Sequence, residues 1–191
     1  NFPEVWVSRS GVLALSNGFD QHDCTRLNLT LTPSAQMQLL EQWGKAGGAT
    51  LTQAELILIL RTTLGSMVYP ADLLNVIRKV QAKRGNEISA QIEQGKVSMS
   101  RAIVAEMTGA KDIPDEARFY VPVFAESAVP SSEGISVVID PQPEQERFRM
   151  IVKPGEIERA YANAEAAVIA GVVAWFEKNQ KTIPVYRGRP C

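Results

Sequence analysis

The residues best suited to a chemical role in this sequence are six positively charged ones near its middle. They are Arg78, Lys79, Lys83, Arg84, Lys96 and Arg101. Cations grouped in this way can neutralise nucleic-acid phosphates. Cations at the end of a helix also stabilise it through its dipole, and no aromatic residues for base stacking are interleaved with these six. We therefore expect a structural role for the group at 78–84 and keep nucleic-acid contact by the six as the alternative.

Catalytic chemistry has little support in the sequence. His22 is the only histidine, so a base beside a nucleophile is hard to supply. The sequence has no G-x-S-x-G elbow, and the glycines at 44–48 lack the strand, the G-K-[ST] ending and the helix of a phosphate loop. Lys96, Ser98 and Ser100 at strand spacing are a weak Ser-Lys alternative. We predict that the protein is not an enzyme and has no cofactor and no catalytic residues.

Two groups of residues contain potential metal ligands. Asp20, His22 and Cys24 offer oxygen, nitrogen and sulfur donors, but a polar segment of this kind is typical of a solvated hairpin tip. The second group is acidic and surrounds Pro114. Carboxylates in such a loop could bind magnesium, but the pattern indicates this only weakly. Its members are Asp112, Asp115 and Glu116. We predict no metal site.

The overall composition is that of an ordinary globular domain. The chain has 191 residues, 45% of them hydrophobic, and 20 basic residues against 21 acidic ones give a net charge of -1. This balance argues against a strong general attraction to nucleic acid or to an anionic membrane. Two cysteines exclude a disulfide framework. There is no apolar run long enough to span a membrane and no visible secretory leader, so we expect a protein without membrane contact.

The elements that must position these residues begin with strands and continue with helices. Strict alternation at 25–32 predicts a half-buried strand, and Thr32-Pro33 predicts the start of a helix. Thr52 and Glu55 form a capping box at the start of a helix that runs to about residue 64 and is apolar nearly all round. A third helix is predicted from Pro70 to about residue 83, stopped by Gly85-Asn86.

The second half of the chain is mostly strands. Gln94-Gly95 predicts a hairpin that joins 87–93 to 96–107, with Ile88, Ala90 and Ile92 on one face. The remaining predicted elements are a strand at 119–124, a hairpin pairing 135–139 with 147–153, a long helix at 154–179 and an edge strand at 183–187.

These patterns predict an α+β fold with a mainly antiparallel sheet, built as a meander of hairpins, and about four helices. The long C-terminal helix should pack on the sheet. We expect residues 1–191 to form a single compact domain, with 33–84 as an alternative helical subdomain inserted between strands. Nine residues are predicted to be buried, namely Leu27, Leu29, Leu31, Ile88, Ile92, Val137, Phe148, Val168 and Trp175.

Several stretches of this chain resemble the YfdQ-like family of phage and prophage proteins of unknown function. They are LNLTLTPSAQMQLLEQW, TLTQAELILIL, NVIRKVQAKRGNEISAQIEQGKVSMS, IPDEARFYVPVF and IPVYRG. The resemblance extends over nearly all of the chain and rests more on the order of hydrophobic segments than on polar residues. It implies a viral protein in the host cytoplasm and provides no catalytic residues to transfer to this chain.

The resulting functional expectation is a non-catalytic, phage-encoded interaction protein. We expect it to assemble with itself, because the helix at 52–64 is apolar around most of its circumference and the sheet has edges to pair. A host protein is the expected second partner, and inhibition of a host defence system is one instance of such a role. The alternative is a nucleic-acid-associated accessory factor that uses the basic residues at 78–84.

Overall fold

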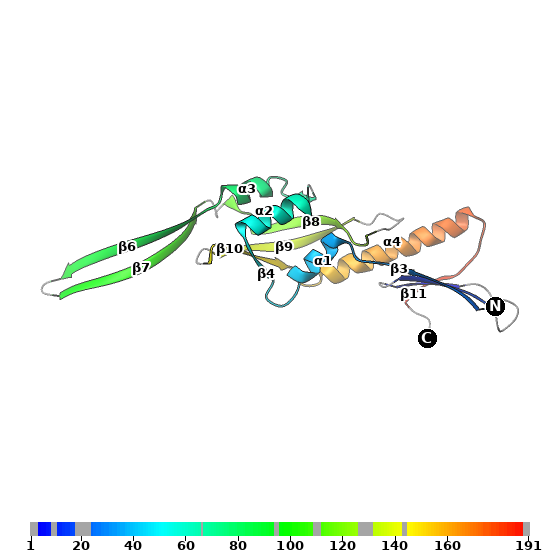
Figure 1. Ribbon diagram of the computed structural model, residues 1–191. Helices are drawn as coiled ribbons and strands as arrows, with labels where there is room; N and C mark the ends of the chain where they lie inside the picture. Colours follow the sequence, from blue (N-terminus) through cyan, green and yellow to red (C-terminus); the bar gives the residue numbers. More distant parts are fainter. Residues whose placement is uncertain are drawn as a thin grey trace. The chain divides into compact units, whose positions relative to one another are not determined.

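The computed structural model describes residues 4–8, 11–17, 24–65, 67–93, 96–108, 112–125, 132–142 and 145–188. Across these ranges the chain has four helices and mostly antiparallel sheets (Figure 1), which confirms the predicted α+β class. The elements are β1 (Glu4–Ser8), β2 (Gly11–Asn17), β3 (Cys24–Thr30), α1 (Ala35–Trp43), β4 (Ala49–Thr52), α2 (Gln53–Thr62), β5 (Val68–Tyr69), α3 (Leu73–Lys79), β6 (Gln81–Glu93), β7 (Lys96–Thr108), β8 (Glu116–Pro122), β9 (Ser132–Gln142), β10 (Arg147–Val152), α4 (Glu156–Lys178) and β11 (Val185–Arg187).

The chain divides into two compact units, which are described separately. Unit 1 contains residues 1–44, 119–136 and 152–191, and unit 2 contains residues 45–118 and 137–151. The expectation of a single domain over 1–191 stays a prediction.

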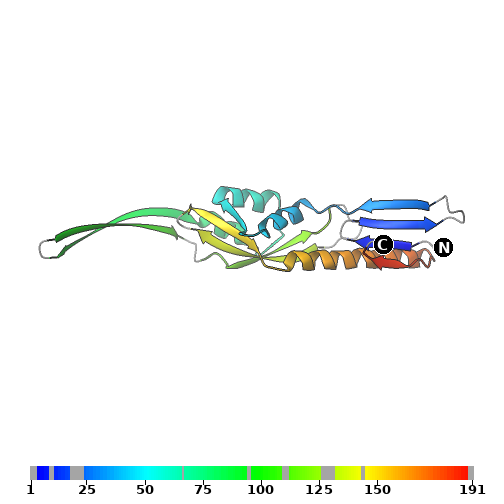
Figure 2. The same cartoon turned by 90° about the horizontal axis from the view of Figure 1, so that it is seen from below.

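Unit 1 contains a four-stranded sheet in the order β11-β1-β2-β3. β1, β2 and β3 pair antiparallel, whereas β11 joins β1 in parallel, with Val5 opposite Val185. α4 contacts β1 and β11 and runs along this sheet (Figure 2). The predicted packing of the C-terminal helix on a sheet is therefore confirmed, but this sheet is the one that contains β1 and β11, whereas the helix was predicted to cover the meander in the second half of the chain. The edge strand predicted at 183–187 is confirmed as β11.

α1 begins two residues later than the sequence predicted. Ser34, not Thr32, is the N-cap, and its hydroxyl accepts a hydrogen bond from the Met37 amide at 3.0 Å. The reason lies in the neighbouring segment, because the Thr32 carbonyl accepts from the Ala125 amide and the Ser34 amide donates to the Val123 carbonyl. These bonds keep the chain extended through Ser34, so the helix cannot start earlier.

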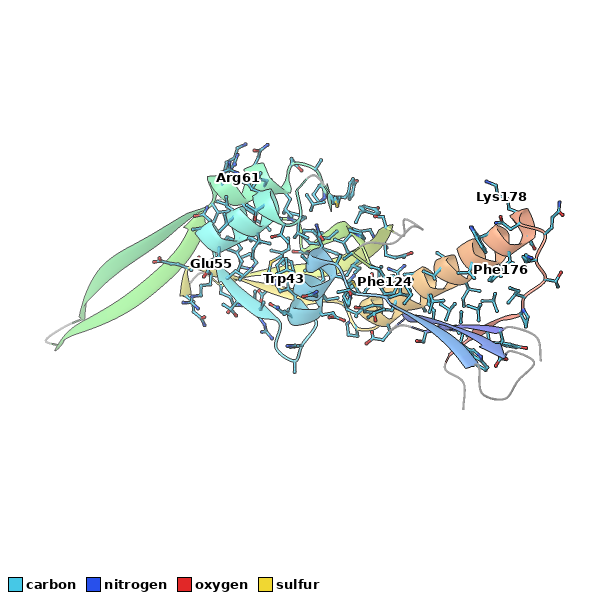
Figure 3. All side chains as sticks on the ribbon, turned by 45° about the vertical axis from the view of Figure 1, so that its right-hand side comes forward. Trp43, Glu55, Arg61, Phe124, Phe176 and Lys178 are labelled. Carbon is cyan, nitrogen blue, oxygen red and sulfur yellow. The ribbon has the colours of Figure 1, made fainter. Side chains whose placement is uncertain are left out.

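Aromatic side chains fill the core of unit 1. Trp43 at the end of α1 meets the edge of Phe119 with ring centroids 5.9 Å apart, and Phe124 lies 6.0 Å from Tyr161 of α4. The Tyr161 hydroxyl donates to the Glu41 carboxylate at 2.9 Å. Trp43 and Phe124 are labelled in Figure 3. These contacts join α1, α4 and the segment after β8 in one apolar cluster.

The buried positions of α4 form a stripe that excludes Trp175. Tyr161, Glu165 and Val168 are buried, and Val172 and Phe176 continue the stripe half-buried. Trp175 lies next to this stripe and is 60% exposed, so the prediction that it is buried is wrong. An α-helix has 3.6 residues per turn, so the contact face that includes Val172 continues at Phe176 and leaves Trp175 beside it.

Leu29 is also exposed, against prediction. It lies on β3, the strand at one edge of the four-stranded sheet, and is 58% exposed. Leu31 is half-buried. α4 contacts β1 and β11, which lie towards the opposite edge of the same sheet from β3. The predicted burial of Val137, Phe148 and Val168 is confirmed, and the burial of Leu27, Ile88 and Ile92 lies outside what the structure describes.

Unit 2 is built around α2, α3 and strands of a five-stranded sheet in the order β4-β10-β9-β8-β5. The short strands β4 and β5 were not predicted from the sequence. The capping box of Thr52 and Glu55 is confirmed at the start of α2. Leu56 and Leu60 are buried, but Leu58 is 61% exposed, so part of the apolar circumference of α2 is exposed to solvent.

The region after α3 differs most from the sequence prediction. α3 ends at Lys79, not near residue 83, and β6 begins at Gln81. Gly85-Asn86 lies within β6 and does not stop a helix. β6 and β7 form a separate two-stranded sheet, which we name the ribbon, and do not join the predicted meander with β8 to β10.

Candidate functional site

The ribbon is the candidate functional site, and its length sets it apart from the other strand pairs described. Each strand has 13 residues, paired without interruption from Gln81 opposite Thr108 to Glu93 opposite Lys96. At about 3.3 Å per residue the ribbon is roughly 40 Å long. Its strands run side by side away from α2 and α3 (Figure 1), and within the described residues they pair only with each other.

The two faces of the ribbon differ in polarity. Residues alternate between the faces of a strand, and directly opposite residues in an antiparallel pair share a face. The register therefore places one largely apolar set together, which we name the apolar face. It includes Ile88, Ala90, Ile92, Val97, Met99 and Ile103, and the same face also carries Arg84, Asn86 and Arg101. The opposite, polar face carries Lys83, Glu87, Glu93, Lys96 and Glu106.

Opposite charges are matched across the polar face. Lys83 stands opposite Glu106, and Lys96 stands opposite Glu93. Cross-strand pairs of opposite charge stabilise a sheet, whereas like charges directly opposite destabilise it. The register therefore places residues of opposite charge at opposite positions at both ends of the ribbon.

The structure divides the six predicted basic residues between two elements. Arg78 and Lys79 are exposed on the last turn of α3, and the other four lie on the ribbon. The carbonyls of Ile77 and Val80, at the end of α3, accept hydrogen bonds from the Gln53 side-chain amide at 2.6 and 2.9 Å. Because the helix ends at Lys79, the prediction that Lys83 and Arg84 belong to its last turn is wrong.

A second surface feature lies at the end of β3 in unit 1. A cavity of about 330 Å³ is lined by residues that include the exposed Leu29 and the buried Phe124. The full lining is Leu29, Thr30, Leu31, Thr32, Phe124 and Ala125. It offers two hydroxyl groups and no titratable side chain, so it suits an apolar group better than it suits catalysis.

The two groups of potential metal ligands lie partly outside the described residues. Asp112, Asp115 and Glu116 are exposed, and among the described residues no group of three or more acidic, histidine or cysteine residues could hold a metal ion. Asp20 and His22 lie outside the described residues, as does the side chain of Cys24. Of the helices in the described ranges, none is long and apolar enough to cross a membrane.

The pKa of Glu55 is lowered, and its cause is structural. The Thr52 amide donates to the Glu55 carboxylate at 2.8 Å and the Thr52 hydroxyl bonds to it at 2.9 Å. These two bonds, the backbone bond first, hold the pKa of this carboxyl below its ordinary value. Glu55 caps α2, as labelled in Figure 3, and has no catalytic geometry around it.

Comparison of the chain with protein-family models, with curated proteins and with solved structures found no match.

Proposed function

We propose that this protein is a non-catalytic interaction protein that assembles with itself through the ribbon and acts on a second protein. One observation carries the proposal. In the described part of the chain, the 13 paired residues of β6 and β7 have no third strand beside them.

A two-stranded ribbon of this kind is incomplete on physical grounds. An isolated pair of strands is marginally stable in water, and a third strand or a covering layer is normally needed. Each outer edge also presents a row of unpaired amides and carbonyls, which is a template for another chain. Because Ile88, Ile92 and Val97 share a face, pairing with another chain would also extend an apolar surface.

The biological setting of the proposal comes from the resemblance to the YfdQ-like family. It supports a phage-encoded protein in the cytoplasm of the host, with a host protein as its second partner. Inhibition of a host defence system is one role that fits a protein without catalytic machinery.

The experiment compares the intact chain with a variant that lacks the ribbon. Gln81 and Thr108 stand opposite each other, so a two-residue Asn-Gly turn can replace residues 82–107. Two differently tagged copies are expressed together in phage-infected cells, and proteins retained on one tag are identified by mass spectrometry. We expect the intact chain to retain its second copy and a host protein, and the shortened chain to lose the second copy. Retention of no protein by the intact chain would contradict the proposal.

The alternative function is nucleic-acid association. It is favoured by the exposure of Arg78 and Lys79 immediately before β6, which carries Lys83 and Arg84. A gel shift that weakens steeply as salt rises would support this alternative, because phosphate contacts release counterions. A complex that is absent even at low salt would exclude it.

A further inference from the structure

If the proposed self-assembly is correct, the strand register of the ribbon indicates which of its edges binds a second copy. The ribbon has two outer edges, one on β6 and one on β7. For each edge, the charges of the strand can be compared with those of the same strand in a second copy. Symmetric dimers are the commonest assemblies, and a two-fold axis pairs a strand antiparallel with itself.

β6 is self-complementary when the axis passes through Ile88. Lys83 then stands opposite Glu93 of the second copy, and the reverse pair forms at the other end of the strand. Between them Glu87 stands opposite Ser89 of the second copy, and Ile88 stands opposite Ile88 of the second copy. No like charges are opposite each other in this register.

The charges then alternate across all four strands. Within one chain Glu106 is opposite Lys83, and Glu93 is opposite Lys96. Across the dimer the row reads Glu106, Lys83, then Glu93 and Lys96 of the second copy, so each charge has only opposite neighbours. Alternation of this kind stabilises a sheet.

β7 lacks this complementarity in any register that keeps its two faces apart, because Arg101 lies on the opposite face from Glu106 and only Lys96 shares a face with that glutamate. The register that brings Lys96 opposite Glu106 of a second copy is centred on Arg101. Arg101 would then stand directly opposite itself, which is destabilising. The charge pattern therefore favours the β6 edge.

We infer that β6 binds β6 of a second copy in antiparallel register centred on Ile88, so that two ribbons form one four-stranded sheet. Faces alternate along a strand, so residues with even numbers lie on one face of β6 and residues with odd numbers on the other. In this register an even-numbered residue always pairs with an even-numbered one and an odd with an odd, so paired residues share a face. The two apolar faces therefore join into one. A sheet of four strands also meets the requirement for stability that a single ribbon fails.

Two double variants test the register without disturbing the charge pairs inside the ribbon. The first combines Lys83→Glu with Glu106→Lys, and the second combines Glu93→Lys with Lys96→Glu. In each variant, both intermolecular pairs become like-charged. We expect each variant alone to dimerise about 30-fold more weakly than the natural chain, from the reversal of two cross-strand pairs. Mixed together, the two variants restore opposite charges at both pairs and should form a heterodimer of near-natural affinity.

Sedimentation velocity of each variant and of the mixture gives the dissociation constants, and circular dichroism checks that each variant is folded. Lys79→Glu, on α3 and outside the interface, is the matched control and should dimerise as the natural chain does. If both double variants dimerise with natural affinity, or the mixture forms no heterodimer, the inferred register is wrong.

A cysteine at the axis gives an independent measurement. With Cys24 and Cys191 replaced by serine, Ile88→Cys should form a disulfide-linked dimer on mild oxidation, because directly opposite residues lie within disulfide range. Ser98→Cys, on β7 away from the axis, is the control and should remain monomeric on a denaturing gel. Equal cross-linking of both variants, or none at position 88, would overturn the register. Self-association that survives such a result would leave the proposed function intact.

Discussion

Replacing Arg187 with methionine should destabilise unit 1 more than the exposed position of Arg187 suggests. The Arg187 Nε and Nη2 atoms each lie 2.8 Å from Oε2 of Glu165. The Arg187 side chain is 62% exposed, whereas that of Glu165 is 12% exposed. The pair joins β11 to α4, so its loss leaves a nearly buried carboxylate without its cation.

The expected cost lies between two known limits. An exposed ion pair contributes about 0–1 kcal/mol, and removal of one partner from a fully buried pair costs about 3–5 kcal/mol. With one partner buried and the other exposed, we expect Arg187→Met to cost about 2 kcal/mol. Glu165→Gln should cost less, under about 1 kcal/mol, because the exposed guanidinium left behind remains hydrated.

A double-mutant cycle measured by denaturant unfolding separates these effects. In the Glu165→Gln background, Arg187→Met should cost only about 0.5 kcal/mol, since no charge is left stranded. For the single Arg187→Met variant, the melting temperature should fall by roughly 4–8 °C. Additive costs, or a larger cost for Glu165→Gln than for Arg187→Met, would refute the argument that the buried carboxylate dominates.

Three further predictions concern the helices. Val168→Asp should unfold unit 1, at a cost above about 4 kcal/mol, because it places an unpaired charge at a buried position of α4. Val168→Ala is the control. A cooperative melt of the aspartate variant near the melting temperature of the natural chain would contradict the burial of this position. Ser34→Ala should cost about 1–2 kcal/mol in urea unfolding, since the Ser34 hydroxyl accepts from Met37 and donates to the Pro122 carbonyl; an unchanged midpoint would show that the cap contributes nothing. Because the folded-state pKa of Glu55 is lowered, its stabilisation is present above its unfolded pKa and is lost as pH falls through the folded pKa. Glu55→Gln should remove this acid dependence from the melting curves, and an identical dependence in both proteins would contradict it.

Features set by local interactions could be predicted from the sequence. The capping box of Thr52 and Glu55 needs only residues three positions apart, and the structure has it where predicted. The pairing of β9 with β10 and the helix α4 follow from strong periodicity within each segment.

Features that depend on residues far apart in the sequence could not be predicted from it. Residues 81–83 were predicted to be the end of the third helix, but they pair with residues 106–108 across the ribbon, and that register decides their conformation. Leu29 and Trp175 have the spacing of buried residues, yet burial depends on which elements cover them. Neither is covered by the neighbours that the pattern assumed.

The candidate site was only partly predictable for the same reason. Charge spacing in the sequence singled out Lys83 and Lys96, but the glutamates opposite them emerge only from the strand register. The polarity of the ribbon was visible at Ile88, Ala90 and Ile92, while its full length and its separation from the other sheets were not.

The mass of the intact chain in solution is the most direct test of self-assembly through the ribbon. Light scattering coupled to size-exclusion chromatography gives this mass at micromolar concentration, for the intact chain and for the variant in which Asn-Gly replaces residues 82–107. We predict that the intact chain has twice the mass of one chain and that the shortened chain has the mass of one. An intact chain that elutes with the mass of a single chain would contradict the central claim.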